Sequence, residues 1–181
     1  MVVVGGIAMH AFAIDRFGER GSVRELAIPE PEAGEVLVRV TAASVNPIDW
    51  MVAKGFLEDR VEHRFPLILG LDVSGVVERV GTGVEGHAVG NEVYGFSTKP
   101  FFGAGTFAEF TTLPASGIAR KPSSVDHEGA AALPHTALTA IPAVEVVDPQ
   151  DGQVVLLVGA AGGVGSFVTQ LAARQGLVWW P

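Results

Sequence analysis

The sequence predicts a mixed fold, in which a domain of short β-strands is followed by the beginning of an α/β domain. Over the first two thirds of the 181 residues, short apolar runs alternate with glycine and proline, which is typical of a barrel or sandwich. Beyond Pro122 the sequence becomes rich in alanine, and it ends on an apolar run, a glycine-rich turn and a helical pattern. This change of character predicts one domain over residues 9–122 and a second over residues 123–181.

Charge and composition exclude several classes of function. The formal net charge is -8, and an acidic surface repels phosphate backbones, so we expect no nucleic-acid partner. The chain has no cysteine, which excludes disulfides, cysteine-ligated zinc and thiol catalysis. Residues 1–14 are apolar, but they lack a basic leading region and are interrupted by His10, so no signal peptide or membrane span is expected. We therefore expect a cytoplasmic protein without a membrane partner.

The first domain is predicted from five strand-like segments. "EVLVRV" (35–40) alternates, which places its three valines on one face. "DVSGVVERVG" (72–81) has Gly75 inside a strand pattern, which predicts a bulge or a close approach of two backbones. Three further segments follow at a spacing of roughly ten residues, as in all-β domains. They are "GNEVYGF" (90–96), "GTFAEFTTLP" (105–114) and "SGIARKP" (116–122).

A helical stretch is predicted for residues 123–147. Alanine is frequent there, and Ser123 or Ser124 is available as the N-cap. We expect Pro134 and Pro142 to break or kink this stretch, because proline removes a backbone donor and clashes with the preceding turn.

A strand, a glycine-rich turn and a helix are predicted for the last part of the chain. "VVLLV" (154–158) is a continuous apolar run, as expected of a parallel strand covered on both faces, and residues 163–176 have the period of an amphipathic helix. The turn between them carries Gly159, Gly162 and Gly165, which is typical of a dinucleotide phosphate site, although a plain glycine-rich turn is the alternative. The residue that selects NAD or NADP is expected about twenty positions further on, where the chain has Trp179.

Four stretches carry a resemblance to a known family. The chain resembles the zinc-independent quinone oxidoreductase (zeta-crystallin-like) branch of the medium-chain dehydrogenase/reductase superfamily. The stretches are "AASVNPIDWMVAKG" (42–55), "FPLILGLDVSGVVERVGTGVEGHAVGNEVYG" (65–95), "GTFAEF" (105–110), and "ALTAIPAV" (137–144) with "VLLVGAAGGVGSFVTQLA" (155–172).

The resemblance implies a GroES-like β-barrel domain followed by a Rossmann domain, of which this chain holds only the start. It implies hydride transfer from NADPH to a quinone or activated alkene, in the cleft between the domains. Zinc-dependent relatives have cysteine and histidine ligands where this chain has "NPID" (46–49) and "GLD" (70–72), so no zinc is expected. We interpret the ending "GLVWWP" (176–181) as a truncated or frame-shifted second Rossmann strand.

The resemblance also implies residue roles. Asn46, Asp49 and Trp50 would line the nicotinamide and substrate cleft; the alternative is a turn, a helix cap and a core residue. Thr139 would contact the nicotinamide amide, unless it bonds to its own helix backbone. Asp72 is interpreted as structural and not catalytic, and each histidine as structural or at the surface. The pyrophosphate would be held by Gly159, Gly162, Gly163, Val164 and Gly165.

Two functions from different classes remain open. The first is an NADPH-dependent quinone oxidoreductase. The alternative is an inactive truncated reductase, or a GroES-like interaction module that oligomerises through open strand edges. Since the apolar strand at 154–158 lacks sheet neighbours, we expect either a disordered or aggregating tail or a homodimer that shares strands. The sequence does not identify the substrate.

Overall fold

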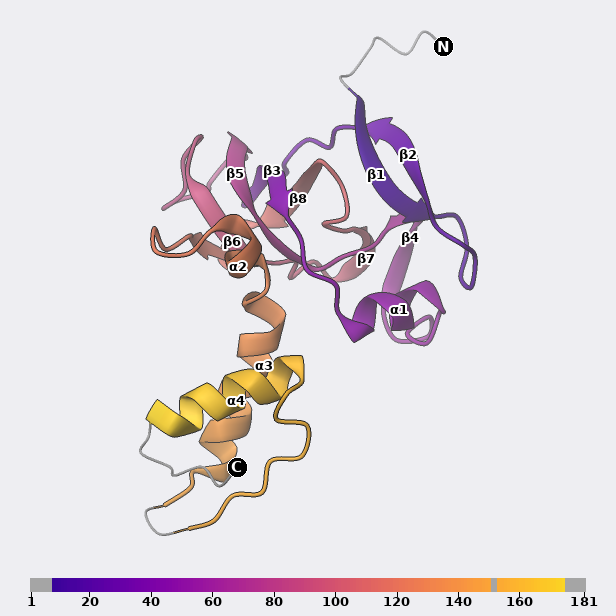
Figure 1. Ribbon diagram of the computed structural model, residues 1–181. Helices are drawn as coiled ribbons and strands as arrows, with labels where there is room; N and C mark the ends of the chain where they lie inside the picture. Colours follow the sequence, from indigo (N-terminus) through magenta and orange to yellow (C-terminus); the bar gives the residue numbers. More distant parts are fainter. Residues whose placement is uncertain (1–7, 151–152, 175–181) are drawn as a thin grey trace, which may run out of the picture. The chain divides into compact units, whose positions relative to one another are not determined.

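The computed structural model describes residues 8–150 and 153–174, which form two compact units (Figure 1). The first unit is Met1–Ala132 and the second is Leu133–Pro181. The first unit holds β1 to β9, α1, a short 3-10 turn and α2, whereas the second holds α3 and α4. The division falls ten residues beyond the change of composition at Pro122, because α2 packs on β3, β5 and β6 of the first unit.

The first unit contains two sheets among the described residues. One has the order β2-β1-β4-β7, with β1 antiparallel to both neighbours and β4 parallel to β7. The other is fully antiparallel and has the order β8-β3-β5-β6-β9. The strands are β1 (Ala8–Ile14), β2 (Ser22–Ala27), β3 (Glu35–Ala42), β4 (Glu62–Ile68), β5 (Asp72–Val80), β6 (Glu92–Phe96), β7 (Phe101–Ala104), β8 (Phe110–Pro114) and β9 (Ile118–Arg120).

The five-stranded sheet buries its own inner face, as a partly open barrel does. Every buried member of its apolar cluster comes from that sheet, and the alternation predicted for residues 35–40 places Val36 and Val38 in it. The predicted segments contain β5, β6, β8 and β9 and cover β3 except for its last two residues, so these strand predictions are confirmed. The cluster is Val36, Val38, Val73, Val77, Val93, Leu113 and Ile118.

Gly75 lies at the predicted close approach of two backbones. A Cβ on Gly75 would lie 2.2 Å from the carbonyl oxygen of Arg39 on the neighbouring strand. The register shifts at the same place, since Val40 faces Gly75 but Ala42 faces Ser74, which leaves one extra residue on β3. The bulge and the missing side chain therefore occur together.

The predicted helical stretch at 123–147 consists of two helices, α2 (His127–Ala131) and α3 (Pro134–Val147). The predicted serine caps are wrong: Asp126 is the N-cap of α2, because its Oδ1 accepts a hydrogen bond from the Gly129 N–H at 2.7 Å. Pro134 separates the two helices as expected and occupies the first turn of α3. Pro142 does not end the helix, which continues to Val147.

The predicted strand at 154–158 is wrong for this structure. Residues 153–157 have no regular secondary structure, and Val154 and Leu156 are 91% and 87% exposed. A parallel strand needs the backbone groups of a neighbouring strand, and no described segment of the second unit supplies them. The helix that follows is confirmed as α4 (Gly163–Arg174), which packs against α3; the position expected to end it, Gly176, lies outside the described residues.

Among the described residues, no helix has the length and apolar character needed to cross a bilayer.

Candidate functional site

Helix α1 (Pro47–Ala53) in the first unit carries the predicted catalytic residues. Its N-cap is Asn46, which has an extended backbone, and Pro47 occupies the first helical position. The Asn46 backbone N–H donates to Oδ2 of Asp49 at 2.7 Å, so the carboxylate of the third helical residue closes the cap. At the other end, the Gly18 N–H donates to the carbonyl of Ala53 at 2.8 Å. A seven-residue helix is marginal alone, so these contacts hold it in place.

The side chain of Asn46 belongs to a closed polar network with Ser44 and Asp72, which we call the Asp72 network. Nδ2 of Asn46 donates to Oδ2 of Asp72 at 3.0 Å and to Oγ of Ser44 at 3.2 Å. The Ser44 hydroxyl in turn donates to the same Asp72 oxygen at 2.7 Å. Both amide hydrogens of Asn46 are therefore engaged, and Asp72 is fully buried at the start of β5.

Trp50 is the member of the predicted trio that reaches the surface. Its side chain is 57% exposed and meets Phe56 edge to face, with 5.1 Å between ring centroids. By contrast, Asn46 and Asp49 are buried. The exposure of Trp50 excludes the interpretation of this residue as core. The turn and cap interpretation describes what Asn46 and Asp49 do within the protein, and their roles toward a ligand stay a prediction.

The glycine-rich turn of the second unit leads directly into α4. Gly159 has a φ of 82°, in the left-handed region that favours glycine, and its carbonyl accepts from the Gly162 N–H at 2.9 Å. A Cβ on Gly165 would lie 2.0 Å from the same carbonyl oxygen, so the turn and the first turn of the helix are in direct contact. Gly163 and Val164 begin α4.

This arrangement fits a pyrophosphate group. The first turn of any helix leaves backbone N–H groups without an intrahelical acceptor, and the helix dipole favours an anion there. No side chain occupies the inside of the turn at Gly159, Gly162, Gly163 or Gly165. These glycines and Val164 are therefore the residues that could hold the phosphates of a dinucleotide. Trp179, at the position where the residue selecting NAD or NADP was expected, lies outside the described residues.

Thr139 makes the local contact that was the alternative to cofactor binding. It lies in α3, and its Oγ1 donates to the carbonyl of His135 at 2.8 Å. This hydroxyl uses its hydrogen within the helix and keeps only acceptor capacity for a ligand.

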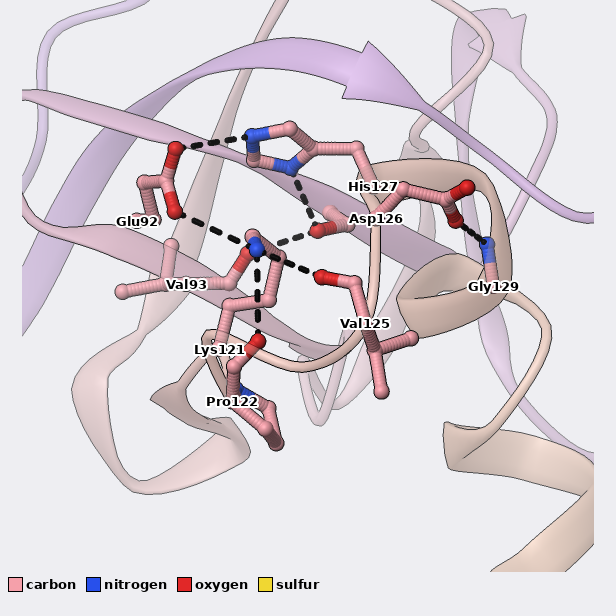
Figure 2. Close-up of polar contacts among 9 residues, drawn as sticks. Glu92, Val93, Lys121, Pro122, Val125, Asp126, His127 and Gly129 are labelled. Carbon is pink, nitrogen blue, oxygen red and sulfur yellow. Dashed lines mark hydrogen bonds and ion pairs between the residues drawn. The ribbon is translucent and has the colours of Figure 1, made fainter.

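A second polar cluster, shown in Figure 2, joins α2 to the sheet. Nδ1 of His127 lies 2.7 Å from Oγ of Ser74, and its Nε2 lies 3.5 Å from a carboxylate oxygen of Glu92. Lys121 lies 3.2 Å from the other carboxylate oxygen and donates to the Val125 carbonyl at 2.7 Å. The hydrogen bond and charge of Lys121, followed by those of His127, hold the pKa of Glu92 below its ordinary value.

The series Ser74, His127 and Glu92 has the residue types of a nucleophilic triad, but its geometry is structural. Ser74 is fully buried, and its hydroxyl also lies 3.0 Å from the Val93 carbonyl, its acceptor within the sheet. A buried serine cannot reach a substrate, whereas nucleophilic catalysis requires that contact. The cluster holds α2 on β5 and β6.

Sequence reasoning missed Ser44, Ser74 and the position of Asp72 in a network. One signal was available: Asp72 and Ser74 are polar residues at alternate positions in the first half of β5, where their neighbours are valine and glycine, and so share one face. No group of three or more histidine, aspartate or glutamate side chains that could hold a metal occurs in the residues that the structure describes.

Comparison with known proteins identifies the family. Residues 32–123 match the alcohol dehydrogenase GroES-like domain. The chain is 36% identical over 184 residues to the mitochondrial NAD(P)H oxidoreductase RTN4IP1 of Homo sapiens, covering 90% of this chain and 46% of the relative. It is 34% identical over 178 residues to the chloroplast envelope quinone oxidoreductase homolog of Arabidopsis thaliana, covering 93% and 54%.

Solved structures agree with this assignment. The quinone oxidoreductase from Coxiella burnetii superimposes with a TM-score of 0.82 at 31% identity, covering 93% of this chain and 54% of that one. The quinone oxidoreductase of Pseudomonas syringae gives 0.82 at 30% identity, covering 93% and 50%. The chain thus spans about half the length of the relatives it matches. It belongs to the alcohol dehydrogenase GroES-like family, in the quinone oxidoreductase branch of the medium-chain dehydrogenase/reductase superfamily.

Proposed function

We propose that this chain takes part in an NADPH-dependent, zinc-independent reduction of quinones or activated alkenes. Its first unit supplies the surface that faces the substrate, and its second unit supplies the turn that holds the cofactor's pyrophosphate. The observation that carries the proposal is the Gly159–Gly165 turn against the start of α4, because its backbone geometry has a place for an anion. The names of the relatives support the substrate class and the use of NAD(P)H.

The surface of the first unit suits a flat, apolar substrate. Trp50 and Phe56 are both more than half exposed and meet edge to face, so part of each aromatic face is open to a ligand. Aromatic rings stack on planar molecules in offset or edge-to-face arrangements. Trp50 is therefore the residue of the predicted trio that contacts the ring, while Asn46 and Asp49 hold the helix that carries it.

The chemistry comes from the nicotinamide, which supplies a hydride when the cofactor is bound. The residues of this chain bind and orient: α4 and the glycine turn hold the phosphates, and Trp50 stacks on the quinone ring. Because no Lewis acid is proposed, rate acceleration has to come from positioning and polar contacts.

The proposal is tested by the oxidation of NADPH in the presence of a naphthoquinone, followed by the loss of nicotinamide absorbance. NADPH should be oxidised only in reactions that contain both the quinone and the native protein, and not in reactions that lack either one. Trp50→Ala should raise the KM for the quinone and leave the affinity for NADPH phosphates unchanged. Absence of any quinone-dependent oxidation at saturating NADPH would reject the proposed activity for this chain.

A second candidate function, self-association, rests on the exposed apolar surface of the second unit. The exposed apolar segment at 154–158, together with α3 and α4, borders an apolar hollow of about 410 Å³ within the second unit. Exposed apolar surface of this kind is typical of an interaction site. We propose as the alternative an interaction module whose partner is a second copy of the chain, and sedimentation equilibrium distinguishes a homodimer from a monomer.

A cytoplasmic location is likewise our proposal, to be tested by cell fractionation.

A further inference from the structure

We propose that Asp72 is a positioning residue that fixes Asn46, and through it the orientation of Trp50. The part of this inference that concerns a ligand rests on the proposed function, but the effect on Trp50 itself does not. From the sequence, Asp72 is expected to be a structural carboxylate without a catalytic role. Its contacts give it a more specific task.

Asp72 connects two distant parts of the chain. It begins β5, while Ser44 and Asn46 lie in the connection between β3 and α1. One oxygen, Oδ2, accepts from both the Ser44 hydroxyl and the Asn46 amide, so both donors are held at one point. Ser44 also accepts from Asn46, which closes the network and fixes the plane of the amide. A carboxylate acceptor makes these bonds stronger than neutral ones.

The residue that carries this amide also marks the start of α1. Asn46 is the N-cap residue, and its backbone N–H is held by Asp49. Val52 anchors α1 in an apolar cluster with Ile14, Leu67 and Leu69, and the contacts at the two ends of this seven-residue helix complete its placement. Trp50 is its fourth residue and is largely exposed, so few core contacts hold its ring. The Asp72 network, together with the packing of Val52, therefore sets where the ring lies.

The burial of Asp72 explains why this arrangement is stiff. The carboxylate is fully buried, so water does not compete for its hydrogen bonds. A binding surface that is already ordered loses less conformational entropy when a ligand arrives. Under the proposed function, the Asp72 network thus preorganises the aromatic surface for a quinone ring.

The test uses the full chain with Trp179→Phe and Trp180→Phe, which leaves Trp50 as the only indole of the three. Time-resolved anisotropy and acrylamide quenching then report the mobility and accessibility of Trp50 without any ligand. Asp72→Asn removes the charge at constant size, and Ser44→Ala is a milder second variant should the first fail to fold. Ser74→Ala is the matched control, because Ser74 is equally buried two residues along β5 but contacts His127.

Asp72→Asn and Ser44→Ala are expected to increase the local motion and the quenching of Trp50, whereas Ser74→Ala leaves both unchanged even where it lowers the unfolding midpoint. The double variant Asn46→Asp with Asp72→Asn exchanges amide and carboxylate, and should restore the native anisotropy. The Kd for a naphthoquinone is expected to rise about tenfold in Asp72→Asn, since the ligand must then order an aromatic surface that is no longer preorganised.

The outcomes separate the two proposals. Unchanged Trp50 motion in both Asp72→Asn and Ser44→Ala, or equal changes in Ser74→Ala, would overturn the positioning role. Increased Trp50 motion in a chain whose native form binds no quinone would support the positioning role and reject the proposed function.

Discussion

The carbonyl oxygen of Gly159 lies 2.0 Å from the position that a Cβ on Gly165 would occupy. This contact joins the glycine turn to the first turn of α4, and it admits no side chain at Gly165. Gly163, two residues earlier, is different, because a Cβ there would meet Thr136 at an ordinary distance of 3.5 Å.

Gly165→Ala is therefore expected to push the turn away from α4 and to weaken NADPH binding at least tenfold. Overpacking of this kind costs roughly 1–3 kcal/mol, and about 1.4 kcal/mol corresponds to tenfold in Kd. Ala173→Gly is the control, because it lies in the last turn of α4, away from the glycine turn, and it should bind NADPH within about threefold of native. Isothermal titration calorimetry measures both. Equal affinities for native and Gly165→Ala would show that the phosphates do not bind at this turn.

Asp126→Ala should destabilise the first unit by about 1 kcal/mol, the usual cost of a lost N-cap. The Gly129 N–H loses its acceptor, and α2 is only five residues long. Ser123→Ala and Ser124→Ala should each change the free energy of unfolding by less than about 0.5 kcal/mol, as surface substitutions do. Urea unfolding followed by circular dichroism gives these values. A larger effect for either serine than for Asp126 would contradict the assigned cap.

Glu92 predicts a pH dependence of stability. Lys121, and to a smaller extent His127, hold the pKa of this carboxylate below its ordinary value of 4.5. Because the pKa is lower in the folded state, the stabilising contribution is present above pH 4.5 and is lost as the pH falls through the folded-state pKa. The difference in thermal midpoint between native chain and Glu92→Gln should be positive at neutral pH. This difference in thermal midpoint should shrink as the pH is lowered from 4.5 through the folded-state pKa of Glu92.

The effect of Glu92 should be small, since the pair is solvent-accessible and exposed ion pairs contribute little. Added salt should reduce it further at neutral pH. A difference between native chain and Glu92→Gln that stays constant from neutral to acid pH would contradict the assigned ion pair.

The first unit was the part most accessible to sequence reasoning. Alternation at Val36 and Val38 and the glycine at position 75 predicted strands and a backbone contact, because both depend on local pattern. The sequence predicts the cap of α2 at the serines, two or three residues too early, since residue type alone does not show which side chain reaches a free N–H. The structure shows that Asp126 does.

The segment at 154–158 shows the limit of local pattern. Its composition is that of a buried parallel strand, yet strand formation depends on neighbours that the sequence of the segment does not contain. The Asp72 network was missed for a related reason: Ser44 and Asp72 are 28 residues apart, and only the fold brings them together. Sequence reasoning named Asn46, Asp49 and Trp50, but it could not tell the two buried positioning groups from the exposed ring.

The most direct test of the proposed function is a titration of the chain with NADPH, followed by tryptophan fluorescence, with NADH in parallel. Saturable quenching in the micromolar range, stronger for NADPH than for NADH and shifted to at least tenfold higher NADPH concentration in Gly165→Ala, is the predicted result. Fluorescence that shows no saturable change up to millimolar NADPH would contradict cofactor binding by this chain.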